Sequence, residues 1–262
     1  MGGTATASVS SGQSPAARRY HDEGYLIVRG LFSPKEMEAV SMDAERLLGR
    51  TDLISSRNLR CRYQPGCGEG GCVFETFDPV IDLSPACASL ASDPRLLAVL
   101  ADLYGESASL FKDKLIFKPP SARGYDLHQD FIAWPGFPRS FLTAMIAIDS
   151  CGLHNGCTVV YPGRQKDGLL SPEDGEYHPL PASCVAGTDP VPLELRPGDV
   201  AFFGCLMPHE SAVNSSGDWR RMLYLSYNAG SDGDLRDSHY RHFVSWLKTK
   251  YADYGKTDTY FA

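Results

Sequence analysis

The sequence predicts a mainly β protein of the α+β class, with an antiparallel core that is flanked by helices. From about residue 110, short runs rich in β-branched and aromatic residues alternate with Pro/Gly turns, a spacing typical of a sandwich or jelly roll. Helical periodicity is found in two segments before the β core and in one at the C-terminus. The predicted order is therefore N-terminal helices, a β core and a C-terminal helix.

Composition and charge exclude several functional classes. The chain has 262 residues, of which 43% are hydrophobic and 22% charged, with a net charge of -7. This acidity argues against binding to the phosphate backbones of nucleic acid. No apolar run approaches the ~18 residues that a membrane span needs. We therefore expect a small-molecule substrate and neither a nucleic acid nor a membrane partner, while the oligomeric state stays open.

The first residues are small and polar and lack the hydrophobic core of a signal peptide. They predict a disordered tail over 1–18, followed by a single domain over 19–262, and a cytoplasmic location with reduced thiols. Among the eight cysteines, Cys61, Cys67 and Cys72 are separated by five and four residues, with no fourth ligand nearby. Thiols in a loop or core are therefore favoured over a zinc site.

Start and stop signals place the first elements. A strand-like run ends the segment 21–28, and Ser33-Pro34-Lys35-Glu36 has the form of a capping box with Pro at the first helical position. A second helix is expected after Ser92 as N-cap and before Gly105. The segment 51–87 between these helices is predicted to be rich in loops.

The later strands and the closing helix follow from the same patterns. Apolar runs bounded by turns predict strands over 114–118, 141–149, 157–161, 193–195, 200–203 and 222–227. Helical spacing of apolar residues predicts a last helix over 236–251.

His128, Asp130 and His209 are candidate metal ligands. Residues two apart in an extended segment point the same way, so the His128 imidazole and the Asp130 carboxylate converge. One further imidazole completes the two-His, one-carboxylate face of non-haem iron enzymes. His209 is the candidate, because a Pro-Gly turn at 197–198 starts an aromatic strand that leads to it. Taken alone, each motif also fits a surface pair or a buried structural histidine.

Arg220 and Arg221 open the last predicted strand. Neighbours on a strand face opposite sides, so only one of the two points into the core. A buried guanidinium is costly unless a carboxylate pairs with it. An inward arginine beside an open metal face therefore favours an anionic co-substrate, and two solvated surface arginines are the alternative.

In combination these motifs resemble the phytanoyl-CoA dioxygenase family. The resemblance covers about residues 20 to 250. It rests on the order and spacing of five motifs: His128-Gln129-Asp130, Asn155–Gly163, Pro197-Gly198-Asp199, His209-x-Ser211 and Arg220. It implies a double-stranded β-helix, the cupin-like jelly roll. It also implies that His128, Asp130 and His209 bind Fe(II), and that Arg220, Ser211 and Lys118 bind 2-oxoglutarate.

The implied activity is that of an Fe(II)/2-oxoglutarate-dependent dioxygenase, which uses O₂ to hydroxylate an unactivated C–H bond and releases succinate and CO₂. The resemblance leaves the substrate open. We expect a small polar, charged metabolite, such as an aminophosphonate, an amino acid, a betaine or an aminated natural-product intermediate. The candidate substrate-binding residues are Asn58, Arg60, Arg62, Lys114, Trp134 and Arg139. Two alternatives remain, a cupin-type isomerase, epimerase or metal-binding protein without 2-oxoglutarate turnover, and an acyl-CoA hydroxylase.

Overall fold

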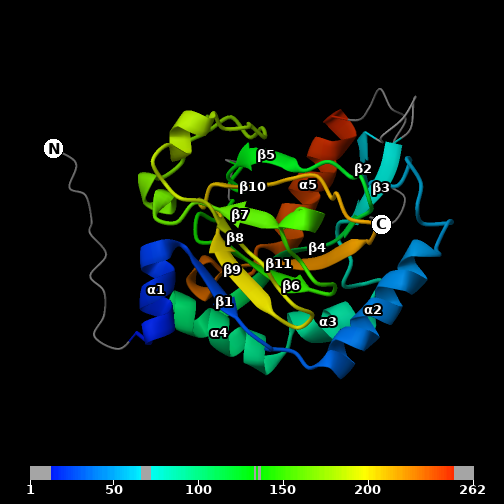
Figure 1. The fold of residues 1–262 in the computed structure, drawn as a ribbon, viewed down its shortest axis with the longest axis horizontal. Coiled ribbons are helices and arrows are strands. Elements are labelled where there is room, and N and C mark those ends of the chain that lie inside the picture. Colours follow the sequence, from blue (N-terminus) through cyan, green and yellow to red (C-terminus); the bar gives the residue numbers. More distant parts are fainter. Residues whose placement is uncertain (1–12, 66–71, 133, 135–136, 251–262) are drawn as a thin grey trace.

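Two antiparallel β-sheets form the centre of the protein in a computed structural model that describes residues 13–65, 72–132, 134 and 137–250 (Figure 1). The larger sheet has the strand order β1-β9-β6-β11-β4-β3-β2, and the smaller has the order β5-β10-β7-β8. The strands are β1 (Tyr25–Val28), β2 (Cys61–Pro65), β3 (Cys72–Phe77), β4 (Ala108–Lys118), β5 (Tyr125–His128), β6 (Leu142–Ala147), β7 (Thr158–Val160), β8 (Val191–Pro192), β9 (Val200–Gly204), β10 (His209–Ser211) and β11 (Arg220–Ala229). The prediction of a mainly β fold is confirmed.

Helices cover the larger sheet and close the chain. They are α1 (Pro15–Glu23), α2 (Pro34–Leu48), α3 (Pro85–Ala91), α4 (Pro94–Tyr104) and α5 (Arg236–Lys250), with short 3₁₀ turns at Leu153–Asn155, Arg164–Asp167, Ala182–Val185 and Gly230–Asp232. Figure 1 shows α1 to α4 along one side of the larger sheet. None of the described helices is both long enough and apolar enough to cross a membrane.

The predicted cap of α2 is confirmed, and that of α4 is wrong by one residue. The Ser33 hydroxyl accepts from the Glu36 N–H while the Glu36 carboxylate accepts from the Ser33 N–H, as a capping box requires. At α4 the side chain of Asp93, and not that of Ser92, accepts from the first turn, because Ser92 ends the preceding helix α3.

Segment 51–87 was predicted to be rich in loops, but it contains a β-hairpin. β2 and β3 pair antiparallel, and Thr76 and Phe77 of β3 pair with Ile116 and Leu115 of β4. The hairpin therefore adds two strands to the edge of the larger sheet. Cys61 is buried in it, whereas Cys67 lies outside the described residues.

Helix α1 begins inside the segment predicted as a tail. Ser14 caps it by accepting from the Ala17 N–H, and Ala17 is fully buried against the helical layer. Regular structure therefore begins before residue 18, the predicted end of the tail. Residues 1–12 lie outside the described part.

Strand alternation divides the larger sheet between two apolar cores. On one face, residues such as Phe117, Phe202 and Leu225 pack against the four N-terminal helices. On the other face, Met145, Phe203 and Met222 pack with Val160 of the smaller sheet. The second core fixes the distance between the sheets, and the polar residues discussed below lie on the same inner face.

We expect Phe202→Ala to lower the free energy of unfolding by about 3–5 kcal/mol, because it leaves a cavity at a fully buried position between sheet and helices. Urea unfolding measures the change. Met42→Ala is the control, because Met42 is 66% exposed and its truncation should change stability by less than about 0.5 kcal/mol. Equal transition midpoints for the two variants would contradict the assigned core.

Candidate metal centre

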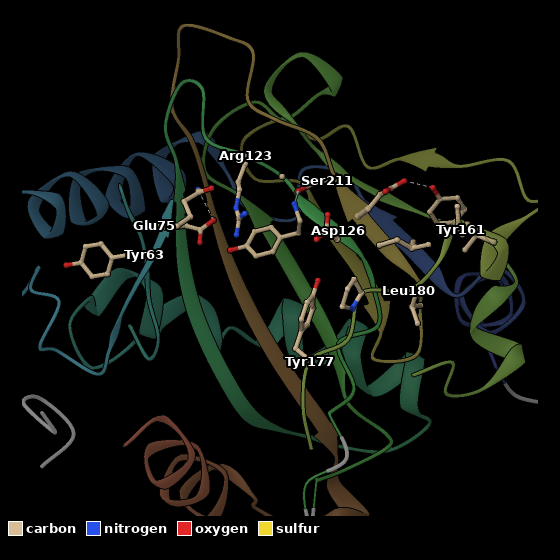
Figure 2. Close-up of a pocket in the computed structure, with 16 residues that line it drawn as sticks. Tyr63, Glu75, Arg123, Asp126, Tyr161, Tyr177, Leu180 and Ser211 are labelled. Atoms are coloured by element: carbon tan, nitrogen blue, oxygen red, sulfur yellow. Dashed lines mark hydrogen bonds between the residues drawn. The ribbon is translucent and has the colours of Figure 1, made fainter. Parts of the chain in front are cut away.

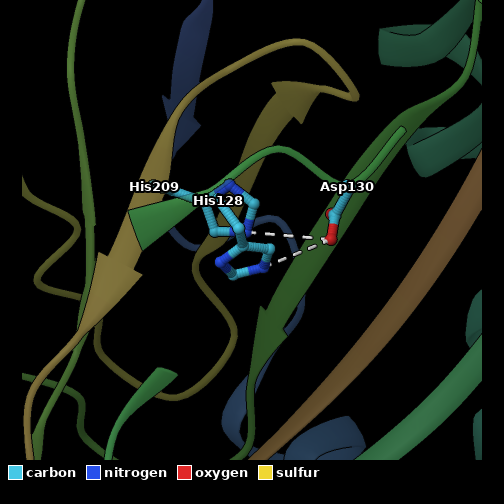
Figure 3. A group of neighbouring side chains, drawn as sticks. All are labelled: His128, Asp130 and His209. Atoms are coloured by element: carbon cyan, nitrogen blue, oxygen red, sulfur yellow. Dashed lines mark ion pairs between the residues drawn. The ribbon is translucent and has the colours of Figure 1, made fainter. Parts of the chain in front are cut away.

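His128, Asp130 and His209 meet at one edge of the smaller sheet (Figure 3). His128 is the last residue of β5 and His209 the first of β10, and the two are cross-strand partners with ring centroids 4.2 Å apart. Asp130 follows β5 by two residues. The predicted convergence of the three side chains is therefore seen in the structure.

The ligand atoms of these side chains are arranged for one shared ion. Asp130 Oδ1 lies 3.7 Å from His128 Nε2 and 3.8 Å from His209 Nε2. Each Nδ1 donates to a backbone carbonyl, of Asp126 at 2.7 Å and of Met207 at 2.9 Å. Because Nδ1 carries the proton, both Nε2 lone pairs are free for a metal. The arrangement forms a two-His, one-carboxylate face.

The charge states of the site also suit a cation. Burial, aided by the neighbouring His209, lowers the pKa of His128 to about 3, so its imidazole is neutral. Burial opposes ionisation of Asp130, but His209 and Lys114 more than offset it, and the pKa of this carboxyl lies below its ordinary value. A neutral imidazole and an ionised carboxylate are the forms that bind divalent metals.

Gln129 fixes the short segment between the two ligands. Its side-chain amide donates to the carbonyls of Gly168 (2.8 Å) and Leu206 (2.7 Å) and accepts from the Leu170 N–H (2.8 Å). These bonds tie the segment to two loops. Gln129 is thus buried and structural.

Arg220 and Lys118 lie side by side near the metal face, as cross-strand partners on β11 and β4. Arg220 is 2% exposed. Its guanidinium contacts Cys151 Sγ at 3.7 Å, its Nε has no hydrogen-bond partner, and no carboxylate of a described residue lies within ion-pair distance. An uncompensated buried guanidinium of this kind suits an anionic ligand.

Lys118 and Ser211 lie next to this arginine. The ammonium of Lys118 donates to Ser211 Oγ (3.4 Å), to the Gly156 carbonyl (3.3 Å) and to the Ala212 carbonyl. Burial and the neighbouring Arg220 lower the pKa of Lys118 to about 8. Ser211 and Arg220 line one small cavity together with His128, Asp130 and His209. The predicted anion-binding residues and metal ligands are therefore neighbours.

Arg221 points the other way, as strand alternation predicts. Its guanidinium pairs with both carboxylate oxygens of Asp149 at 2.8 Å and donates to Ser41 of α2. Arg221 therefore joins the sheet to the helical layer, and Arg220 alone of the pair faces the cavity.

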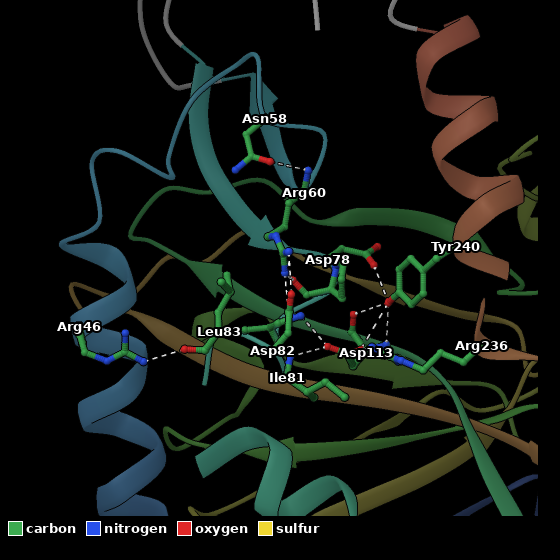
Figure 4. Close-up of polar contacts among 12 residues, drawn as sticks. Arg46, Asn58, Arg60, Asp78, Ile81, Asp82, Leu83, Asp113, Arg236 and Tyr240 are labelled. Carbon is green, nitrogen blue, oxygen red and sulfur yellow. Dashed lines mark hydrogen bonds and ion pairs between the residues drawn. The ribbon is translucent and has the colours of Figure 1, made fainter. Parts of the chain in front are cut away.

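Two predicted substrate residues, Asn58 and Arg60, have structural partners instead (Figure 4). Asn58 donates to the Leu53 carbonyl at 2.8 Å, and Arg60 forms a two-pronged ion pair with Asp82 and donates to the Pro79 carbonyl. Neither lines a cavity that includes a metal-ligand candidate. No local pattern predicts that Arg60 pairs with Asp82, which lies 22 residues away.

Of the other four predicted substrate residues, Arg62 and Arg139 do not line a cavity beside Asp130, whereas Lys114 and Trp134 do. Arg139 is exposed and pairs with Glu173, and Arg62 lies over the Phe243 ring, 4.0 Å from Asp78. Lys114 and Trp134 do line a second cavity of about 90 Å³, which also includes Asp130. Lys112 and His239 also line this cavity, and neither was among the predicted substrate residues.

A wider cavity of about 800 Å³ lies next to β5, which forms part of its wall (Figure 2). Its walls include Glu75, Arg123, Tyr125 and Tyr177, and the ring of Tyr177 lies 5.3 Å from that of His128. Tyr125 and Ser211 line both this cavity and the one beside the metal face. It therefore leads from the surface toward the metal site.

Comparisons with known proteins identify a family for this chain. The family model described as Phytanoyl-CoA dioxygenase (PhyH) matches residues 20–222. The methylphosphonate hydroxylase of Gimesia maris is 38% identical over 138 residues, which cover 53% of this chain and 52% of that protein. The 2-aminoethylphosphonate dioxygenase of an uncultured bacterium (HF130_AEPn_1) is 31% identical over 172 residues, covering 65% of this chain and 63% of that protein. The chain thus spans about half to two thirds of these relatives.

Solved structures show the same architecture. The crystal structure of EctD from S. alaskensis with bound Fe superposes with a TM-score of 0.69 at 25% identity, covering 88% of this chain and 80% of that one. The arrangement of sheets and helices is therefore shared beyond the segments that align by sequence.

We expect Asp130→Ala to weaken Fe(II) binding by at least about a hundredfold, since even partners of metal ligands contribute about 10- to 100-fold. Anaerobic calorimetric titration measures the affinity. His154→Ala, which removes an exposed histidine outside the cluster, should bind Fe(II) as the unmodified protein does. Unchanged affinity in Asp130→Ala would show that the three side chains do not form the metal site.

Proposed function

Because the chain belongs to the phytanoyl-CoA dioxygenase family, we propose that it is an Fe(II)/2-oxoglutarate-dependent dioxygenase that hydroxylates a small polar, charged metabolite and releases succinate and CO₂. One observation carries the proposal. A two-His, one-carboxylate face and a buried arginine without a carboxylate partner line the same cavity. The first suits a divalent metal and the second suits a dicarboxylate beside it.

We propose that the two sheets form a double-stranded β-helix. Their antiparallel pairing, the shared apolar core between them and the likeness to EctD support this architecture. We also propose a cytoplasmic location, which the free thiols of the described cysteines Cys87, Cys151, Cys157, Cys184 and Cys205 support.

In this proposal His128, Asp130 and His209 hold Fe(II), and Arg220 pairs with a carboxylate of 2-oxoglutarate. When bound, iron and 2-oxoglutarate activate O₂, so that one oxygen atom enters the substrate C–H bond and the other enters succinate. Ser211 and Lys118 add hydrogen-bond donors beside Arg220. The backbone bonds to both imidazoles keep the Nε2 atoms directed at the metal position throughout.

The two alternatives fit the site less well. A cupin-type isomerase, epimerase or metal-binding protein has no use for the buried Arg220, whose guanidinium would remain uncompensated. An acyl-CoA hydroxylase needs an apolar channel for a long chain, whereas the cavities that reach Asp130 contain lysine, histidine and arginine side chains.

The class of substrate follows from the cavities and the relatives together. Lys112 and Lys114 line the space beside Asp130. The two relatives described above are named for methylphosphonate and 2-aminoethylphosphonate, both small charged molecules. Both observations support a small charged metabolite over a lipid.

We expect Arg220→Gln to raise the KM for 2-oxoglutarate by about tenfold or more, because it removes a charge-assisted pair with a carboxylate. Anaerobic titration of the Fe(II) protein, followed by its visible charge-transfer band, provides a direct measure of binding. Arg221→Gln is the matched control, since this neighbour pairs with Asp149 and should cost stability without changing the KM. A metal-loaded protein that shows no band with 2-oxoglutarate would favour the cupin-type alternative.

We expect succinate release to be stimulated by a small charged compound in a screen of phosphonates, amino acids, betaines and acyl-CoAs. The Asp130→Ala variant serves as the blank. Stimulation by acyl-CoAs alone would overturn the proposed substrate class and leave the proposed reaction intact.

A further inference from the structure

The inner face of β4 carries a row of cations. Strand alternation directs Lys112, Lys114, Ile116 and Lys118 to one side, and Ile116 belongs to the core between the two sheets. Lys118 lies beside Arg220, while Lys112 and Lys114 line the 90 Å³ cavity between β4, β6, β11 and α5. Asp130 and Lys114 line this cavity and also the one that contains Arg220. They therefore stand where the two cavities meet.

Lys114 has no direct ion-pair partner among the described residues, although its charge acts at longer range on the carboxylates of Asp130, Asp78 and Glu75. Its neighbour Lys112 pairs with Asp78 at 3.0 Å, and Arg62 lies 4.0 Å from the same carboxylate. Among the described residues no carboxylate lies within ion-pair distance of Lys114, whose ammonium is 5.0 Å from the centre of the Tyr224 ring. This end of the inner face therefore carries more positive than negative charge.

His239 of α5 also lacks polar partners. It is 4% exposed and packs among the rings of Phe111 (4.4 Å), Trp134 (5.5 Å) and Phe243 (5.5 Å). No described group lies within hydrogen-bond distance of either ring nitrogen. Burying polar atoms without partners costs free energy, and such atoms in a cavity wall mark a position for a ligand.

The charge state of His239 determines which hydrogen bonds its ring can form with a ligand. Burial, with Lys112 as the next contribution, lowers the pKa of His239 to about 3. The ring is therefore neutral and provides one N–H donor and one acceptor. In a cavity that Lys114 also lines, this donor suits an oxygen atom of an anion.

We propose that this cavity binds the substrate and selects a small anion, with the Lys114 ammonium pairing with its head group and His239 donating a hydrogen bond to it. The inference rests on the proposed function and specifies the substrate class for the same site. The cavity of about 90 Å³ equals the liquid volume of about three waters and suits a compact head group. Its position beside Asp130 brings the attached C–H bonds to the metal face.

The opposite choice, a cation enclosed by aromatic rings, has support from the Trp134, Phe137 and Phe243 walls. Two lysines in the same wall argue against it, because they repel a cation. The Lys112 ammonium already lies over the Phe243 ring, 4.6 Å from its centre. It therefore takes the place over this ring that a cationic ligand would use.

Three compounds of the same size and shape, but of different charge, test the proposal. Methylphosphonate, tert-butanol and tetramethylammonium each have a central atom with four substituents. We expect methylphosphonate to bind the anaerobic Fe(II)/2-oxoglutarate protein at least about tenfold more tightly than either of the others in calorimetric titration. Tighter binding of tetramethylammonium, or equal affinity for all three, would overturn the inference.

Variants then assign the contacts. Lys114→Met should weaken methylphosphonate binding by about tenfold or more, and His239→Phe, which keeps the ring packing, should weaken it by about three- to tenfold. His239→Gln retains a donor and should restore part of the loss. Lys166→Met is the control. It removes an exposed lysine that lines neither of the two cavities, so this variant should bind as the unmodified protein does. Unchanged affinity in both Lys114→Met and His239→Phe would overturn the assignment.

Failure of this inference and failure of the proposed function give different results. A protein that forms the charge-transfer band and releases succinate with a cationic substrate keeps the function and loses the anion site. A protein that binds methylphosphonate through Lys114 but shows no band keeps the anion site and loses the oxygenase function.

Discussion

The antiparallel pairing of β4 with β11 is the interaction on which the site depends. The two strands run together from the Lys118–Arg220 pair to the Ala108–Ala229 pair, and their register decides which side chains face the space between the sheets. Because alternate residues share a face, the same pairing places apolar side chains against the helices and cations on the inside. Sliding β4 by one residue would turn its lysines away from the metal face, and sliding β11 by one residue would turn Arg220 away.

Burying several cations inside an acidic protein creates an electrostatic imbalance that the fold only partly removes. Asp78 and Asp113 are buried and pair with Lys112 and Arg236, so these contacts need no ligand. Arg220 and Lys114 have no such carboxylate among the described residues. The stability given up at these two positions is consistent with a protein that binds anions on either side of a metal.

Local patterns in the sequence predicted much of this arrangement. The capping box placed α2 to the residue, the His-x-Asp spacing gave two ligands, and alternation separated Arg220 from Arg221. The pairing of strands that are far apart in the sequence could not be predicted from local patterns. In the hairpin, β2 has only five residues and ends in Pro65, and β3 does not alternate regularly between apolar and polar residues, so the segment was predicted as loop.

The same limit explains the substrate residues. Arg60 was a candidate because it lies with Asn58 and Arg62 in a basic and polar segment that would suit an anionic group, and only the fold brings Asp82 to it. His239 could not be recognised, because its unpartnered nitrogens result from the packing of α5 against β4 and the rings around it. The metal-ligand candidates were predictable because their motifs form a known combination, whereas the Arg60–Asp82 pair and the surroundings of His239 depend on distant elements that carry no such motif.

The hydrogen bonds from the imidazoles of His128 and His209 to the carbonyls of Asp126 and Met207 have a consequence for whether the protein folds before it binds metal. Both acceptors belong to the backbone two residues before each histidine, so ring orientation and tautomer are set as soon as β5 and β10 pair. The site is then assembled by the chain itself and does not need an ion as a template. We therefore expect folding and metal loading to be separate events, so that the metal-free protein keeps its fold.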